Sequence, residues 1–239
     1  MRHVVLLLCL IALVTGCMHS PPEYVSVYTP STTSQASARP PVPAAAAVAI
    51  IGDSYTGGTA IGGQGPDGWP ALATARLRQQ GIDIAASVEA ENGSGYATPG
   101  NGLGDTFSDQ IPKVVRKDDR LVVIFGSGGD PAVPPDQLQP AVRQMLDAVR
   151  AAAPNAKIVV IGPVSTNPNP SPELLQTRDA IKTEADATGS VFVDPIAARW
   201  FMNRSDLVGP DGTTPTDAGH SYMADQIAPI IAQQLAANP

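Results

Sequence analysis

Five short apolar runs alternate with stretches of helical character from residue 47 onward. The stretches between the runs, such as WPALATARLRQQG and PELLQTRDAIKTEADATG, have helical spacing and end in Gly. Apolar runs without alternation are typical of parallel strands that are buried on both faces of a sheet. This order predicts a three-layer, doubly wound α/β sandwich with about five parallel strands. The runs are VAIIG (48–52), IDIAASVEA (82–90), RLVVIFG (120–126), KIVVIG (157–162) and VFVD (191–194).

The first 46 residues do not share this pattern. Residues 1–16 have the basic start, apolar stretch and small-residue end of a cleaved signal peptide. The following Cys17 completes a Val-Thr-Gly-Cys that resembles a bacterial lipobox and implies lipidation of Cys17, an ordinary secretory signal being the alternative. Residues 17–46 are rich in Pro, Ser, Thr and Ala, which predicts a disordered tether. We expect an exported lipoprotein, held by Cys17 on the outer face of the cell membrane, with a globular domain over 47–239.

Composition and motif spacing exclude several kinds of partner. Charged residues make up 15% of the chain and the formal net charge is −7, which leaves no basic surface for nucleic acid. The Gly-rich stretch 52–68 has neither the Lys-Ser/Thr of a P-loop nor the glycine spacing of a dinucleotide-binding loop. The sequence therefore predicts a neutral or carbohydrate-like ligand, with no cofactor and no metal.

Ser54 lies in IGDSYTG, directly beyond the first predicted strand. Ligands of doubly wound sheets bind at the carboxyl ends of the strands, so Ser54 is either a nucleophile or only a turn residue. Gly52-Asp53-Ser54 and the order of elements resemble the SGNH (GDSL-type) hydrolases over residues 47–236. The resemblance implies a flavodoxin-like fold, Ser54 as the nucleophile of an esterase, and an oxyanion donor at the N–H of Gly95 in ENGSGYAT.

Two blocks depart from the family pattern. After the third predicted strand the sequence reads FGSGGDP, and Gly129 stands where the family has an Asn whose amide is an oxyanion donor. Near the C-terminus it reads DGTTPTDAGH, where Asp211 keeps the place of the triad acid but Thr214 takes that of the histidine base. A threonine hydroxyl does not titrate near neutral pH and does not accept the serine proton.

His220 is the one imidazole of the predicted globular domain, because His3 and His19 precede it. Its spacing from Asp217 matches Asp-x-x-His, which would make it a displaced base. The following residues have helical spacing, and Thr216 is a suitable N-cap, so His220 would face the sheet from the start of a helix. We expect a core-facing histidine, with the displaced base as the alternative.

These departures lead to competing functional hypotheses. Loss of a triad histidine costs on the order of 10⁶ in kcat, and loss of one oxyanion donor roughly 10² to 10³. The first hypothesis is therefore a catalytically impaired cell-envelope protein that binds an acyl-ester or glycan ligand. The second is an active serine esterase with Ser54 as nucleophile and His220 as displaced base, and a third is a structural lipoprotein. Asp53 is expected to order its turn, and Asp130 to orient loops.

Overall fold

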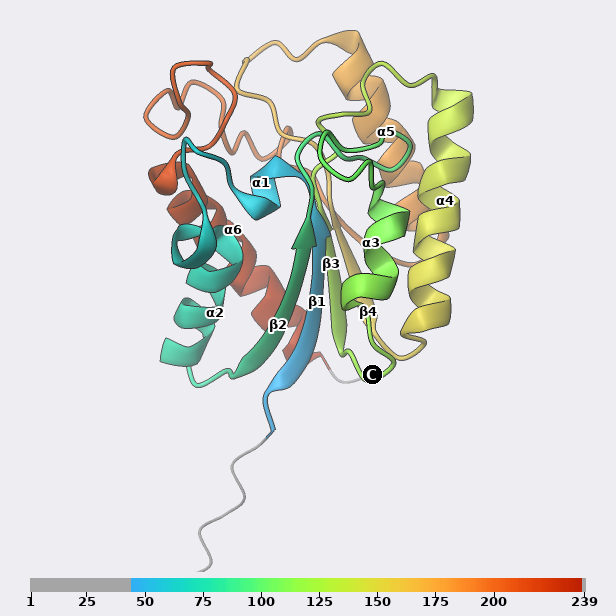
Figure 1. Cartoon of the computed structure of the whole chain (residues 1–239), viewed down its shortest axis with the longest axis vertical. Coiled ribbons are helices and arrows are strands. Elements are labelled where there is room, and N and C mark those ends of the chain that lie inside the picture. Colours follow the sequence, from blue (N-terminus) through green and yellow to red (C-terminus); the bar gives the residue numbers. More distant parts are fainter. Residues whose placement is uncertain (1–43, 238–239) are drawn as a thin grey trace, which may run out of the picture. The chain divides into compact units, whose positions relative to one another are not determined.

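Five parallel strands form the centre of the fold (Figure 1), in the order β2-β1-β3-β4-β5. The computed structural model describes residues 44–237. The predicted signal peptide, Cys17 and nearly all of the tether lie outside this part of the chain. The prediction of a doubly wound sheet with about five parallel strands is confirmed. The strands are β1 (Ala46–Gly52), β2 (Ile84–Ala90), β3 (Leu121–Phe125), β4 (Lys157–Ile161) and β5 (Val191–Val193).

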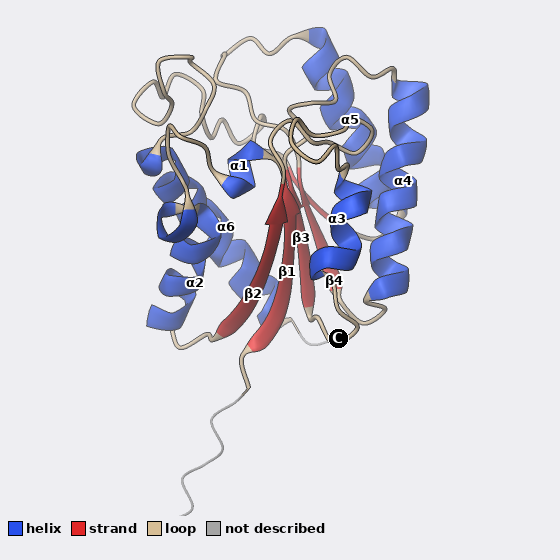
Figure 2. Cartoon of the chain, in the orientation of Figure 1, coloured by secondary structure: helices blue, strands red, loops and turns tan. Residues whose placement is uncertain are grey.

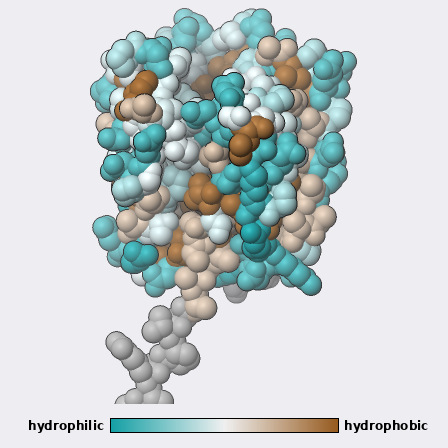
Figure 3. Space-filling view, viewed as in Figure 1, coloured by the Kyte–Doolittle hydropathy of each residue, from teal (hydrophilic) through white to brown (hydrophobic). Residues whose placement is uncertain are grey.

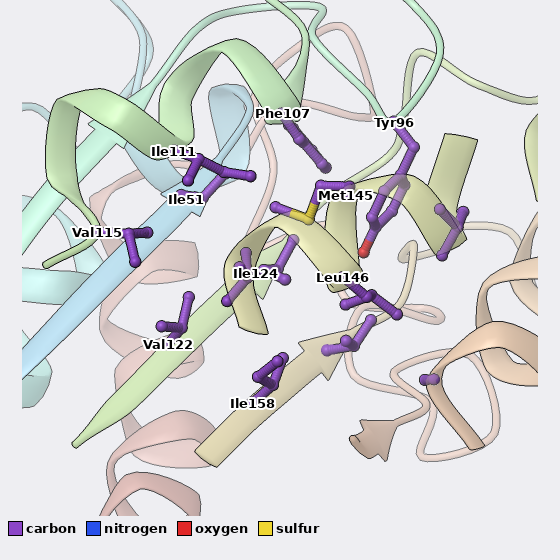
Figure 4. Close-up of a cluster of buried hydrophobic side chains, with 14 of the residues drawn as sticks. Ile51, Tyr96, Phe107, Ile111, Val115, Val122, Ile124, Met145, Leu146 and Ile158 are labelled. Atoms are coloured by element: carbon purple, nitrogen blue, oxygen red, sulfur yellow. The ribbon is translucent and has the colours of Figure 1, made fainter. Parts of the chain in front are cut away.

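Helices cover both faces of this sheet (Figure 2). One hydrophobic cluster lies between the sheet and α3, α4 and α5 (Figure 4), and a second lies between the sheet and α2 and α6. The sandwich therefore has three layers. The helices are α1 (Ser54–Gly57), α2 (Trp69–Gln79), α3 (Phe107–Val114), α4 (Pro135–Ala152), α5 (Pro172–Ala187) and α6 (Asp217–Ala236), with a 3-10 turn, η1, at Gly65–Asp67.

The central strands are apolar throughout because both of their faces are buried. In β1, Ala49 and Ile51 belong to the cluster under α3 and α4, whereas Val48 and Ile50 belong to the cluster under α2 and α6. Successive side chains of a strand point to opposite faces, so alternate residues of β1 pack into the two clusters. All four of these side chains are fully buried.

Two elements differ from the sequence-based prediction. β2 is an edge strand whose residues 85–88 are exposed, so only part of its apolar run is buried. α3 was not predicted; a capping box between Thr106 and Asp109 begins it. The face drawn in Figure 3 carries its apolar residues in small separate patches among hydrophilic ones. No helix within residues 44–237 is long and apolar enough to span a membrane.

Candidate active site

Ser54 lies at the carboxyl edge of the sheet, where β1 passes into α1. Asp53 caps α1 and accepts a hydrogen bond from the Tyr55 N–H at 2.9 Å, so Ser54 is the first residue of the helix. The Ser54 backbone thus lies between the end of β1 and the capped first turn of α1. The side chain is half-buried, which leaves its hydroxyl accessible from the loops above the sheet.

The buried carboxylate of Asp53 also holds the turn that follows β3. Its Oδ2 accepts the N–H groups of Ser127 and Gly128 at 3.1 and 3.3 Å. Burial raises the pKa of Asp53 to about 6, and the hydrogen bonds from Tyr55, Gly128 and Ser127 offset part of that rise. Asp53 therefore orders its turn, as the sequence predicts, and binds the β1 and β3 loops to each other.

A cavity of about 550 Å³ opens above Ser54 at the carboxyl ends of the strands. Its walls come from the loops after β1, β2, β3 and β4 and from the loop before α6. The structure thus brings Ser54 together with two of the altered positions, Gly129 and Thr214, in one cavity. Within residues 44–237, no group of three or more His, Cys, Asp or Glu side chains is arranged to hold a metal ion. The lining includes Ser54, Asn92, Gly93, Asn101, Gly129 and Thr214.

Thr214 and Asp211 form a hydrogen-bonded pair beside this cavity. The Thr214 hydroxyl donates to Asp211 Oδ2, and Asp211 Oδ1 accepts the N–H groups of Thr213 and Thr214 at 3.0 and 2.9 Å. The hydrogen bonds from the Thr214 side chain and from the Thr214 and Thr213 backbone lower the pKa of Asp211 to about 2. Asp211 thus accepts a hydrogen bond from the Thr214 hydroxyl, in the place where the family pattern has a catalytic imidazole.

His220 is fully buried and does not line the Ser54 cavity. Its Nδ1 accepts the Trp69 N–H at 3.3 Å, and its Nε2 lies against Gly63, where a Cβ would be only 2.0 Å away. Burial lowers the pKa of His220 to about 4, although nearby Asp217 acts to raise it. The structure therefore has the core-facing histidine that the helical spacing predicts, and His220 is not among the residues of the Ser54 cavity.

A family model for the GDSL-like lipase/acylhydrolase family matches residues 50–222. The chain belongs to this family. The GDSL lipase Rv0518 of Mycobacterium tuberculosis (strain ATCC 25618 / H37Rv) is 44% identical over 191 residues, which cover 79% of this chain and 82% of that protein. The resemblance to SGNH (GDSL-type) hydrolases is confirmed.

Solved structures share the fold of this GDSL-family chain. The crystal structure of TesA superposes with a TM-score of 0.66 at 21% identity and covers 79% of this chain and 99% of its own. The native aryl esterase of M. smegmatis superposes with a TM-score of 0.60 at 15% identity, covering 80% and 100%. At these identities the likeness concerns the fold.

The N–H of Gly95, which the family pattern assigns to the oxyanion, is already engaged within this GDSL-family member. The Gly95 N–H donates to the Thr98 carbonyl at 2.9 Å, inside a tight turn that wraps around the Asp130 carboxylate. Gly93, two residues earlier, lines the cavity instead, and within residues 44–237 its N–H has no hydrogen-bond acceptor. The motif ENGSG contains both glycines, so the sequence alone does not distinguish them.

Tyr55, the residue after Ser54, joins the Thr214 loop to α1. Its hydroxyl donates to the Thr213 carbonyl at 2.5 Å, and its ring packs edge-on against Phe125 and Phe201. Burial raises the pKa of Tyr55 above its usual value, so the hydroxyl remains a donor at neutral pH. This contact was not predicted from the sequence, because residues 55 and 213 are brought together only by the fold.

Proposed function

We propose that this GDSL-family protein binds an acyl-ester or glycan ligand in the Ser54 cavity and turns esters over slowly or not at all. The observation that carries the proposal is the Thr214–Asp211 pair. It occupies the place of the family's base and acid, but a neutral hydroxyl does not take the Ser54 proton at neutral pH. Among the described residues that line the cavity, none carries an imidazole.

Neither carboxylate near Ser54 is a good substitute for the missing base. Asp211, with a pKa of about 2, remains ionised and has little affinity for a proton at neutral pH. Asp53 has a pKa of about 6, but its two oxygens already accept three backbone N–H groups. Its carboxylate is engaged within the turn, which supports a structural role.

The cavity walls favour a small acyl group on a polar alcohol. Gly, Thr and Asn make up most of the lining, and its hydrophobic and aromatic residues are Tyr55, Phe125, Pro163, Val164 and Leu174. Sites for larger apolar ligands are lined mainly by hydrophobic and aromatic side chains. An acetylated or otherwise short-chain ester of a sugar or polyol fits this chemistry better than a long-chain lipid.

The proposed setting is the bacterial cell envelope. The signal-like residues 1–16 and the lipobox-like Cys17 support export and attachment to the outer face of the cell membrane. A tether over residues 17–46 would let the domain reach ligands in the envelope while its anchor stays in the bilayer.

An active serine esterase is the second candidate. The 44% identical relative is named a GDSL lipase, and Ser54 lies in an open cavity. In this alternative His220 would have to leave its buried position against Gly63 to reach Ser54, or another group would have to act as base.

Hydrolysis of p-nitrophenyl acetate separates the two candidates. We expect wild-type kcat/KM to stay within about tenfold of the Ser54→Ala variant, because no base activates the serine. Thr214→His should restore a base beside Asp211 and raise kcat by about 10² or more. Thr183→His, which adds an imidazole on the exposed side of α5, is the control and should change nothing.

Strong wild-type turnover that is lost in both Ser54→Ala and a folded His220→Ala variant would establish the active esterase and the displaced base. Circular dichroism and the thermal unfolding midpoint of each variant distinguish loss of chemistry from loss of fold.

A further inference from the structure

The position of the family's oxyanion asparagine is sterically closed in this chain. A Cβ at Gly129 would lie 2.4 Å from the Gly93 carbonyl oxygen and 3.4 Å from the Thr98 Cβ. The same two loops are joined by a hydrogen bond from the Thr98 hydroxyl to the Gly129 carbonyl at 2.9 Å. Any side chain at 129 would have to push the β2 and β3 loops apart, so Gly129→Asn is not a simple restoration of the family pattern.

A different asparagine takes up the space beside Gly93. Gly93 has a φ of +78°, and the position that its Cβ would occupy lies 2.4 Å from Asn101 Nδ2. A side chain at 93 would therefore displace the Asn101 amide. Both residues line the Ser54 cavity. Within the described residues, the Gly93 N–H has no hydrogen-bond acceptor.

The loop that carries Asn101 is held in place by Glu91. The Glu91 carboxylate accepts the N–H groups of Gly102, Gly104 and Asp105 at 2.8, 2.9 and 3.1 Å. The Asn101 N–H itself donates to the Asn92 carbonyl at 2.8 Å. Hydrogen bonds thus hold the backbone at Asn101 and in the residues that follow it, while the Asn101 residue itself is exposed. The fixed backbone limits the reorganisation needed for its amide to act as a donor.

From this geometry we propose that Asn101 supplies the side-chain oxyanion donor in place of the residue lost at 129, together with the N–H groups of Gly93 and Ser54. When the Ser54 oxygen bonds to an ester carbonyl carbon, the π electrons move onto the carbonyl oxygen and the hydroxyl proton passes to solvent water, because no described side chain of the cavity serves as its base. The Asn101 amide would donate to that oxygen. The proposal deepens the proposed function, because it assigns a donor to the same cavity.

Phenylboronic acid tests this assignment without requiring turnover. The Ser54 oxygen adds to the trigonal boron, a B–O bond forms, the hydroxyl proton passes to the buffer, and the boron becomes tetrahedral and negatively charged. Boron-11 NMR reports the tetrahedral adduct, and calorimetry gives its Kd. Ser54→Ala should abolish the adduct.

Asn101→Ala and Asn101→Asp should each weaken the adduct about tenfold to a hundredfold. The Ala variant loses the hydrogen bond to the charged boronate, and the Asp variant replaces it with repulsion between two anions. Asn155→Ala, an exposed asparagine at the opposite edge of the sheet, is the matched control and should retain wild-type affinity. The Asp variant keeps the side-chain shape, so it remains informative if the Ala variant is unstable.

Three results would overturn the proposal: no adduct in wild type, unchanged affinity in both folded Asn101 variants, or a comparable loss in Asn155→Ala. None of them depends on the rate of ester hydrolysis. High wild-type esterase activity would refute the proposed impairment and leave the Asn101 result standing, whereas failure of the boronate test would leave the impairment proposal intact.

Discussion

At the scale of single residues, the burial of His220 makes the stability of the fold depend on pH. Its pKa falls from the ordinary 6.5 to about 4 because burial disfavours the charged imidazole. The unfolded chain therefore takes up a proton as pH falls below 6.5, while the folded chain does not. The stability that His220 contributes above pH 6.5 is lost progressively as pH falls toward 4.

We expect this linkage to be worth about 2 to 3 kcal/mol between pH 7.5 and pH 4.5. His220→Gln keeps an acceptor for the Trp69 N–H but does not titrate. Urea unfolding at the two pH values should show a larger loss of free energy of unfolding in wild type than in the variant, by that amount.

The comparison with the variant is needed because Asp53 acts in the other direction. Its pKa is raised from 3.8 to about 6, so its contribution to stability is fully present below pH 3.8 and is lost as pH rises through 6. That contribution is the same in wild type and in His220→Gln. Equal losses in the two proteins would show that His220 is protonated in the folded state or accessible to solvent.

At the scale of elements, α3 holds the backbone that leads into Ser54. Gln110 of α3 is fully buried; its Oε1 accepts the Gly52 N–H at 3.2 Å, and its Nε2 donates to the Gly52 carbonyl and to the Ser94 hydroxyl, both at 3.1 Å. One amide thus joins the end of β1 to the loop after β2. These two segments carry Ser54 and Gly93.

Gln110→Met should lower the free energy of unfolding by about 1 to 3 kcal/mol, because it leaves the buried Gly52 N–H without its partner. Denaturant unfolding measures the change. Gln137→Met, an exposed glutamine of α4, is the control and should stay within about 0.5 kcal/mol of wild type. If both variants behave alike, the Gln110 network does not stabilise the end of β1.

The sequence predicts the strands better than it predicts α3 for a physical reason. Strands β1 and β3, and β4 after Lys157, are apolar and buried on both faces, whereas α3 is short, contains Pro112 and buries a glutamine. The exposure of β2 depends on its place at the edge of the sheet, which is a tertiary property. Gly95 and Gly93 are likewise distinguished only by the turn that Asp130 organises.

At the scale of the whole molecule, strand order explains why the predicted site residues meet. The chain leaves β1 toward β2 on one side and returns to β3 on the other, so the loops after β1 and β3 diverge above the sheet. Ligands of such sheets bind at this switch point, and the Ser54 cavity lies there. Topology thus made Ser54 and Gly129 predictable as neighbours, and the family resemblance placed Thr214 with them. The proposed donors Gly93 and Asn101 of the β2 loop required the structure.

The last prediction concerns attachment of the whole protein to the membrane. A lipid-modified Cys17 should place the full chain in the membrane fraction, since two or more acyl chains give stable anchoring where a single chain is marginal. Cys17→Ser should move it to the soluble fraction. Esterase and boronate measurements on the domain should not change, because residue 17 lies outside the part of the chain that forms the site.

Mass spectrometry of the membrane fraction gives the decisive measurement. A diacylated or triacylated N-terminus at Cys17 is the expected species, and its absence in Cys17→Ser provides the control. Retention of residues 1–16 on the mature protein, or an unlipidated protein found entirely in the medium, would contradict anchoring. In the second case the lipobox-like sequence would mark an ordinary secretory cleavage, and the domain would meet its ligand free in solution instead of at the cell surface.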